Sequence, residues 1–140
     1  MNKIEEEINE LAFADFNALE EIIIPDSVRK IGNYAFMNCH ELREVELPSS
    51  LELLSTTIFN GCEIDRLVVN SGSMICMNAS ATGSFYKDLH INSVVISEKA
   101  GRLTDDFSLP VLNTGRLVLT ADAAETLRGE MLYMARLGSV

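Results

Sequence analysis

The residues of this chain most suited to chemistry are three cysteines and two histidines, and their spacing limits what they could do. Cys39 and His40 are adjacent, but a catalytic thiol needs a base that faces it, and neighbours along a chain seldom face each other. His40 and His90 are too few and too distant in sequence to indicate a metal site. The chain also lacks a nucleophile elbow, a P-loop and a dinucleotide-binding fingerprint. We therefore predict no enzymatic activity, no metal and no cofactor.

Two of the cysteines are related by a spacing that recurs elsewhere in the chain. Cys39 and Cys62 lie 23 positions apart. If the chain coils with this period, they occupy adjacent turns, and a disulfide between them is geometrically conceivable. An odd cysteine count without paired CxxC spacing does not indicate a disulfide framework. Free thiols buried in the core are the favoured interpretation.

The composition is that of one folded domain with a strongly acidic balance. The 140 residues are 47% hydrophobic and 23% charged, and the net charge is −10. Residues 1–50 alone carry eleven acidic and four basic residues, a charge of −7. Such a surface argues against direct binding of nucleic acid or anionic membranes, which are bound by excess Lys and Arg. It permits a basic protein partner, because long-range charge steers association.

The start of the chain, MNKIEEEINEL, does not resemble a signal peptide, because it contains no apolar central region. No run approaches the roughly 18 apolar residues that a membrane helix needs. We expect a cytoplasmic protein from the chain as written. An extracellular location is the alternative if the chain is a piece of a longer secreted protein.

The chain repeats itself with a period of about 23 residues. Five phenylalanines, separated by 23, 23, 26 and 22 positions, are Phe13, Phe36, Phe59, Phe85 and Phe107. Short triplets rich in β-branched residues keep step with them, reading III, VEL, LVV, VVI and LVL, and begin at Ile22, Val45, Leu67, Val94 and Leu117. Such a period indicates a solenoid in which each turn adds a short strand in parallel to the last. The phenylalanines would then form a ladder through the interior.

One stretch carries these features in a recognisable order. The sequence IGNYAFMNCHELREVELPSS resembles the leucine-rich repeat of the BspA-like class, with Ile-Gly, Ala-Phe, Cys, Leu, an alternating strand and Pro-x-Ser. The match is close over residues 28–50, recognisable over 5–27 and 51–70, and weak over 71–120. The resemblance implies a curved, right-handed solenoid used to recognise proteins or ligands.

These observations predict one α/β domain over residues 1–140. We expect a leucine-rich-repeat stack of about five turns over 15–120, with a short parallel sheet. Helical spacing of Ile4, Ile8 and Leu11 predicts an N-terminal helical cap over 1–14. A second amphipathic pattern predicts a C-terminal helix over 121–140, with Asp122 as its N-cap. The Ser-, Gly- and Asn-rich stretch 70–84 is expected to be a loop.

Alternation along each predicted strand indicates which side chains face outward, on the concave side of the sheet. These are the middle residue of each triplet and the residue before it. They are acidic at the first two turns, and apolar with arginines at the last three. The predicted partner-binding residues are Glu21, Ile23, Glu44, Glu46, Arg66, Val68, Val95, Arg116 and Val118. Two alternatives stay open: strand propensity alone could select the apolar residues, or self-association could cover them.

The sequence therefore favours a non-enzymatic module that binds another protein through the concave sheet face. A first alternative is a small acidic inhibitor or immunity protein that blocks a basic nucleic-acid-processing partner. A second is a fragment of a secreted surface adhesin. A solenoid also has two open ends, so a homodimer through one of them stays open.

Overall fold

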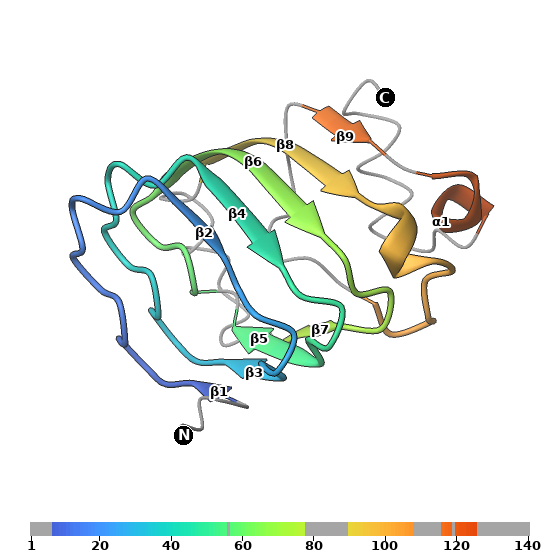
Figure 1. The fold of residues 1–140 in the computed structure, drawn as a ribbon, viewed down its shortest axis with the longest axis horizontal. Coiled ribbons are helices and arrows are strands. Elements are labelled where there is room, and N and C mark those ends of the chain that lie inside the picture. The colour runs from blue at the N-terminus through green and yellow to red at the C-terminus, as the bar shows by residue number, and fades with distance from the viewer. Residues whose placement is uncertain (1–6, 56, 78–89, 108–115, 119, 126–140) are drawn as a thin grey trace.

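The chain winds as a solenoid of parallel strands (Figure 1). The computed structural model describes residues 7–55, 57–77, 90–107, 116–118 and 120–125. The strands are β1 Glu7–Ile8, β2 Glu21–Ile23, β3 Lys30–Ile31, β4 Glu44–Leu47, β5 Leu53–Ser55, β6 Glu63–Val69, β7 Ile75–Met77, β8 His90–Ile96 and β9 Arg116–Val118. A 3-10 helix spans Glu98–Ala100, and α1 spans Ala121–Glu125. About three turns of the solenoid are complete, and the five turns expected from the sequence stay a prediction.

The larger sheet contains the strands that the triplets predicted. Its order is β2-β4-β6-β8-β9, and every neighbouring pair is parallel. The first residues of the triplets pair across it in one row, Ile22, Val45, Leu67, Val94 and Leu117. The predicted alignment of the turns is confirmed, because a repeat that keeps its period brings equivalent residues side by side.

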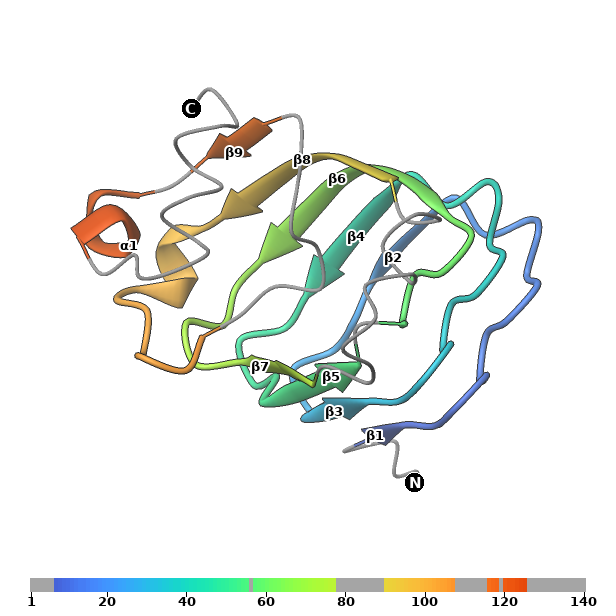
Figure 2. The ribbon, with the colours of Figure 1, turned by 180° about the vertical axis from the view of Figure 1, so that it is seen from behind.

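The structure also contains a second sheet, which was not predicted from the sequence. Its strands β3, β5 and β7 follow β2, β4 and β6 along the chain, after the bend that ends each strand of the larger sheet. Its order is β1-β3-β5-β7, again parallel, and it runs along the lower side of the molecule in Figure 2. Its pairing places Ile8, Ile31, Leu54 and Cys76 in one row. The signal for it was present, since these residues share the 23-residue period, but two-residue strands have almost no pattern of their own.

A stack of phenylalanine rings runs through the interior. The ring centroids of Phe13 and Phe36 are 5.2 Å apart, and those of Phe36 and Phe59 are 5.9 Å apart, both in stacked arrangement. Phe36 and Phe59 are fully buried, and Phe107 is also buried. The predicted ladder is confirmed for its first three members. Phe85 lies outside the described residues.

One backbone position in the bend adopts a left-handed conformation in each of the first three turns. Asp15, Asn38 and Gly61 lie 23 positions apart and have φ angles of 65°, 58° and 82°. Asp, Asn and Gly are the residue types that adopt this conformation most readily. The amide of Asp15 donates to Met37 O at 2.8 Å, and that of Asn38 donates to Asn60 O at 2.9 Å. The bend is therefore repeated by backbone bonds between turns.

The prediction of an N-terminal helix was wrong for residues 7–14. These residues form β1 and a turn, and Leu11 has a φ of 61°. The amide of Gly32 donates to Ile8 O at 2.9 Å, and the amide of Leu11 donates to Asn33 O at 3.1 Å. The apolar spacing fits both a helix and a repeat turn, and the bonds to the next turn decide in favour of the repeat. Residues 1–6 lie outside the described part.

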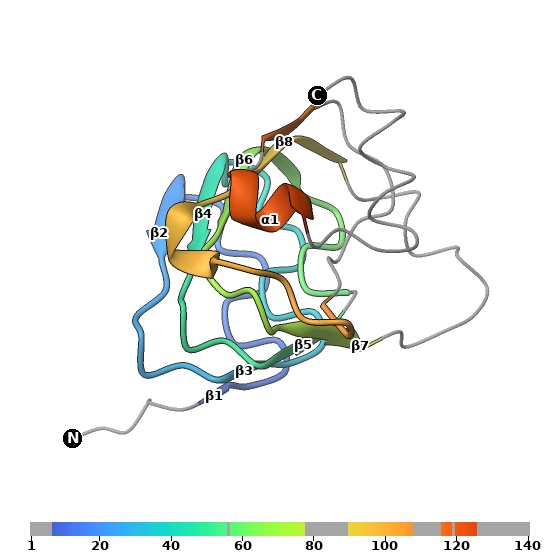
Figure 3. The same ribbon diagram turned by 90° about the vertical axis from the view of Figure 1, so that its right-hand side faces the viewer.

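Within the range of the predicted C-terminal helix, the structure describes only α1, Ala121–Glu125, and its capping residue differs from the predicted one. The amide of Ala123 donates to Thr120 Oγ1 at 3.2 Å, so the capping side chain is Thr120 and not Asp122. Residues 126–140 of the predicted helix lie outside the described residues. Figure 3 shows α1 at the end of the solenoid opposite the first turn.

The stretch 70–84 was predicted to be a loop; residues 70–74 form neither helix nor strand, as predicted, but residues 75–77 form β7. Asn70, Ser71 and Met74 are buried, and β7 follows them. The hydroxyl of Ser71 donates to Leu51 O at 2.7 Å. Its small and polar residues are therefore used in close contacts inside the repeat. Residues 78–84 lie outside the described part.

Candidate protein-binding face

The outer face of the larger sheet carries the residues predicted to contact a partner. They form two rows across the strands. The central row is Ile23, Glu46, Val68, Val95 and Val118, and the charged row is Glu21, Glu44, Arg66, Ser93 and Arg116. Burial supports the outward orientation, because Val45 and Leu67 between the rows are fully buried while Glu44 and Arg66 are exposed. The side chain of Arg116 lies outside the described part.

The apolar members of the central row remain accessible to different extents. Ile23 is 72% exposed and Val118 is 37% exposed, whereas Val68 and Val95 are half-buried. Full burial of one such side chain contributes about 1.5–3 kcal/mol. The central row can therefore supply favourable free energy to a complex without any change of fold.

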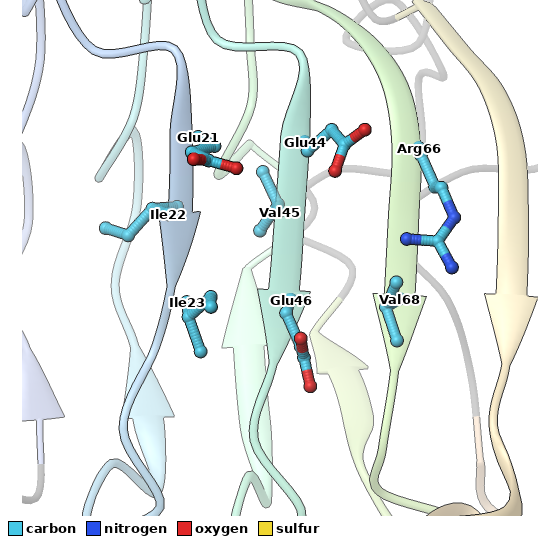
Figure 4. Close-up of a pocket in the computed structure, with 8 residues that line it drawn as sticks. All are labelled: Glu21, Ile22, Ile23, Glu44, Val45, Glu46, Arg66 and Val68. Atoms are coloured by element: carbon cyan, nitrogen blue, oxygen red, sulfur yellow. The ribbon is translucent and has the colours of Figure 1, made fainter.

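The face is hollowed over its first three strands (Figure 4). The hollow has a volume of about 70 Å³ and is lined by Glu21, Ile22, Ile23, Glu44, Val45, Glu46, Arg66 and Val68. The two ion pairs within the described residues, Arg29–Glu52 and Arg43–Glu63, both lie elsewhere. The charged row therefore offers carboxylates on β2 and β4 and a guanidinium on β6.

A buried asparagine supports one member of the central row. Asn70 Nδ2 donates to Glu46 Oε2 at 2.8 Å and to Leu47 O at 2.9 Å. Its Oδ1 accepts from the hydroxyl of Ser97 in the next turn. These contacts hold the Glu46 carboxylate near the C-terminal ends of β4 and β6. The sequence does mark this position, because Asn70 stands where the two earlier turns have Pro25 and Pro48.

A second hollow of about 250 Å³ lies beside the start of β6. The charged and polar side chains that line it already interact with each other. Arg43 forms an ion pair with Glu63 at 3.7 Å, and Asn92 Nδ2 donates to Asp65 Oδ1 at 2.9 Å. Within the described ranges, no group of three or more His, Cys, Asp or Glu side chains could hold a metal ion. No helix in this part of the chain is long and apolar enough to cross a membrane.

The repeat-spaced cysteines are free thiols, as the sequence favoured. Cys39 Sγ donates to Phe13 O at 3.1 Å, and Cys62 Sγ donates to Phe36 O at 3.0 Å. Each thiol therefore bonds to the ladder phenylalanine of the preceding turn. Burial raises the pKa of Cys39 above its ordinary value and raises the pKa of Cys62 to about 12. Both thiols donate to the backbone of the preceding turn, and burial disfavours the thiolate form of each.

We expect the fold to lose stability in alkali through Cys62. Its pKa is about 12 in the folded chain against 9.0 for an ordinary thiol. The folded state holds the proton more tightly, so this contribution is complete below pH 9.0 and is lost as the pH rises toward about 12. Urea unfolding below and above pH 9.0 measures the loss, and Cys62→Ala should reduce it. An equal loss in both proteins would contradict the assignment.

Comparison with known proteins agrees with the repeat. The family model of the BspA type leucine rich repeat region matches residues 6–107 in 6 copies. The matched range includes residues 71–107, where the resemblance read from the sequence was weak. No curated protein and no solved structure matches the chain.

Proposed function

The chain belongs to the BspA-type leucine-rich repeat family, whose repeats generally mediate protein–protein interaction, and on this premise we propose that it binds a partner protein through the outer face of the β2-β4-β6-β8-β9 sheet. The observation that supports this most is the central row. It places Ile23, Val68, Val95 and Val118 in register on one accessible surface. No described side chain of the charged row uses its charge in an ion pair within the chain.

The proposed mechanism is surface burial with charge steering. The apolar residues lose contact with water in the complex, which supplies affinity. Glu21, Glu44 and Arg66 orient the partner, since complementary charges at the rim raise the association rate and exclude wrong partners. No bond is made or broken, in keeping with a family that is typically non-enzymatic.

Replacing Val68 or Val95 by Asp should weaken partner binding at least tenfold, because a buried carboxylate without a partner is costly. Both side chains point outward, so the fold should remain. The matched control is Ile75→Asp, which alters a 40% exposed aliphatic residue on β7 of the other sheet. The measurement is a quantitative pull-down with tagged variants, with thermal unfolding to verify folding. Wild-type binding by both variants would exclude the outer face.

The same pull-down at two salt concentrations tests the acidic inhibitor hypothesis. A partner held mainly by the negative charges of the first turns should be lost as salt rises, because exposed charges are screened. A partner held by the central row should survive. The inhibitor and adhesin-fragment hypotheses stay predictions until this is measured.

A further inference from the structure

The first turn leaves an open strand edge. β2 is the terminal strand of its sheet among the described residues, and it pairs with β4 alone. The amide of Ile24 donates to Glu46 O at 3.0 Å, and the amide of Glu44 donates to Glu20 O at 3.4 Å. Alternate residues of a strand bond to opposite neighbours, so the N–H and C=O groups of Glu21 and Ile23 face away from β4. These groups can pair with another strand.

The first turn, which forms the end of the stack at the left of Figure 1, also carries three exposed apolar residues. Leu11, Phe16 and Ile23 are 47%, 52% and 72% exposed. Phe16 packs edge-on against Phe13, with ring centroids 5.6 Å apart. It stands where Cys39 and Cys62 stand in the next two turns. Phe13, the first ring of the ladder, is thus contacted by one partly exposed ring, whereas Phe36 lies between the rings of two neighbouring turns.

Charge indicates which kind of segment this end can accept. The exposed charged residues of the first turn are all acidic: Glu7, Glu10, Asp15, Glu20, Glu21 and Asp26. No Lys or Arg lies between residues 7 and 28. A second copy docked through the same end would bring two such surfaces together, and charges on an edge strand oppose that pairing. A basic segment meets no such opposition.

The sheet itself contains a model for the expected pairing. β4 carries Glu44 and Glu46 outward, and its neighbour β6 places Arg66 beside Glu44 and Val68 beside Glu46. This pair shows that a strand with a basic and an apolar residue in register fits beside an acidic strand in this fold, whereas the β2–β4 pair places Glu21 beside Glu44. β2, with Glu21 and Ile23, presents the same kind of strand with one side vacant among the described residues.

We propose that the β2 edge binds an extended, basic segment of a partner protein, which adds to the sheet as a further strand. Backbone bonds to Glu21 and Ile23 fix its register, and Lys or Arg side chains lie beside the acidic residues of the first turn. Apolar residues of the segment cover Phe16. The edge shares Glu21 and Ile23 with the outer face, but Phe16 and Glu20 are not among the residues that line the hollow, and Val68 lies two strands away on β6. Variants at these three positions therefore distinguish the two sites.

A phage-displayed library of random linear peptides, selected on the immobilised protein, provides the probe. We expect enriched peptides to alternate Lys or Arg with β-branched residues. A synthetic copy should bind wild type and Val68→Asp equally, and bind Phe16→Asp and Glu20→Lys at least tenfold more weakly. Glu20 is exposed, so that variant remains informative if Phe16→Asp does not fold. On binding, hydrogen exchange should slow at the amides of Glu21 and Ile23.

Other results would overturn the proposal in distinguishable ways. Peptides that lose affinity only with Val68→Asp, without protection of the two amides, would assign binding to the outer face and leave the proposed function intact. A dimer of the chain that is lost with Phe16→Asp would make a second copy the occupant. Acidic peptides, or no enrichment at all, would show that the edge does not accept a basic strand.

Discussion

Replacing Phe36 by Ala is expected to lower the free energy of unfolding by about 3–5 kcal/mol. The ring is fully buried and lies between Phe13 at 5.2 Å and Phe59 at 5.9 Å. Removing it opens a cavity in contact with two turns and breaks both stacked pairs. Since a domain is stable by only about 5–15 kcal/mol, this is a large part of the total. Urea unfolding followed by circular dichroism measures the change.

The matched control for this prediction is Phe16→Ala. Phe16 is 52% exposed and contacts the ladder only at its end, so its removal should cost far less. Equal losses in the two variants would mean that the ladder does not contribute more than ordinary surface contacts. The comparison keeps the chemical change constant and varies only the position in the stack.

Gly72→Ala should destabilise the fold by about 3 kcal/mol, the upper part of the range for overpacking. A Cβ at this position would lie 2.2 Å from Ala100 O and 2.7 Å from Arg102 O. Both are backbone atoms, so no side chain can rotate away. The amide of Thr104 also donates to Gly72 O at 2.9 Å, which ties the two segments together. Thermal and urea unfolding measure the loss.

Gly32→Ala is the comparison for Gly72. Its nearest contact would be Glu10 N at 3.0 Å, which a small backbone shift can relieve. We expect a clearly smaller loss of stability than for Gly72→Ala. If Gly72→Ala unfolds like wild type, the segment 97–107 does not pack against this glycine as the structure shows.

The sheet and the ladder could be predicted because the period repeats the type of residue and not only its polarity. Phe36 and Phe59, and Val45 and Leu67, occur at matching places, so the alignment of turns follows from counting. Alternation within each triplet then indicated the outward residues. The structure agrees, with Glu44 exposed and Val45 buried.

The parts that could not be predicted depend on contacts between turns. Ile8 and Leu11 fit a helix as well as a repeat, and only the bonds to Gly32 and Asn33 distinguish the two. The smaller sheet uses strands of two or three residues, too short for a pattern. Asn70 reads as a loop residue, and its role appears only when Glu46 and Ser97 are placed beside it.

The candidate site likewise has features that the sequence predicts and features that depend on contacts between turns. Counting residues predicted which side chains share the outer face, because that depends on the period alone. It did not predict the hollow, the support of Glu46 by Asn70 or the direction of the free groups on β2. Those features require the positions of backbone atoms in neighbouring turns.

The bonds between turns run along the axis of the solenoid, and this arrangement has a mechanical consequence. A force that pulls the two ends apart loads the bonds of one turn at a time, so the molecule should open like a zipper and not shear as a whole. Neighbouring strands lie about 4.8 Å apart, and an extended residue spans about 3.4 Å. Each turn of 23 residues would therefore lengthen the chain by about 75 Å as it opens, in steps of similar size.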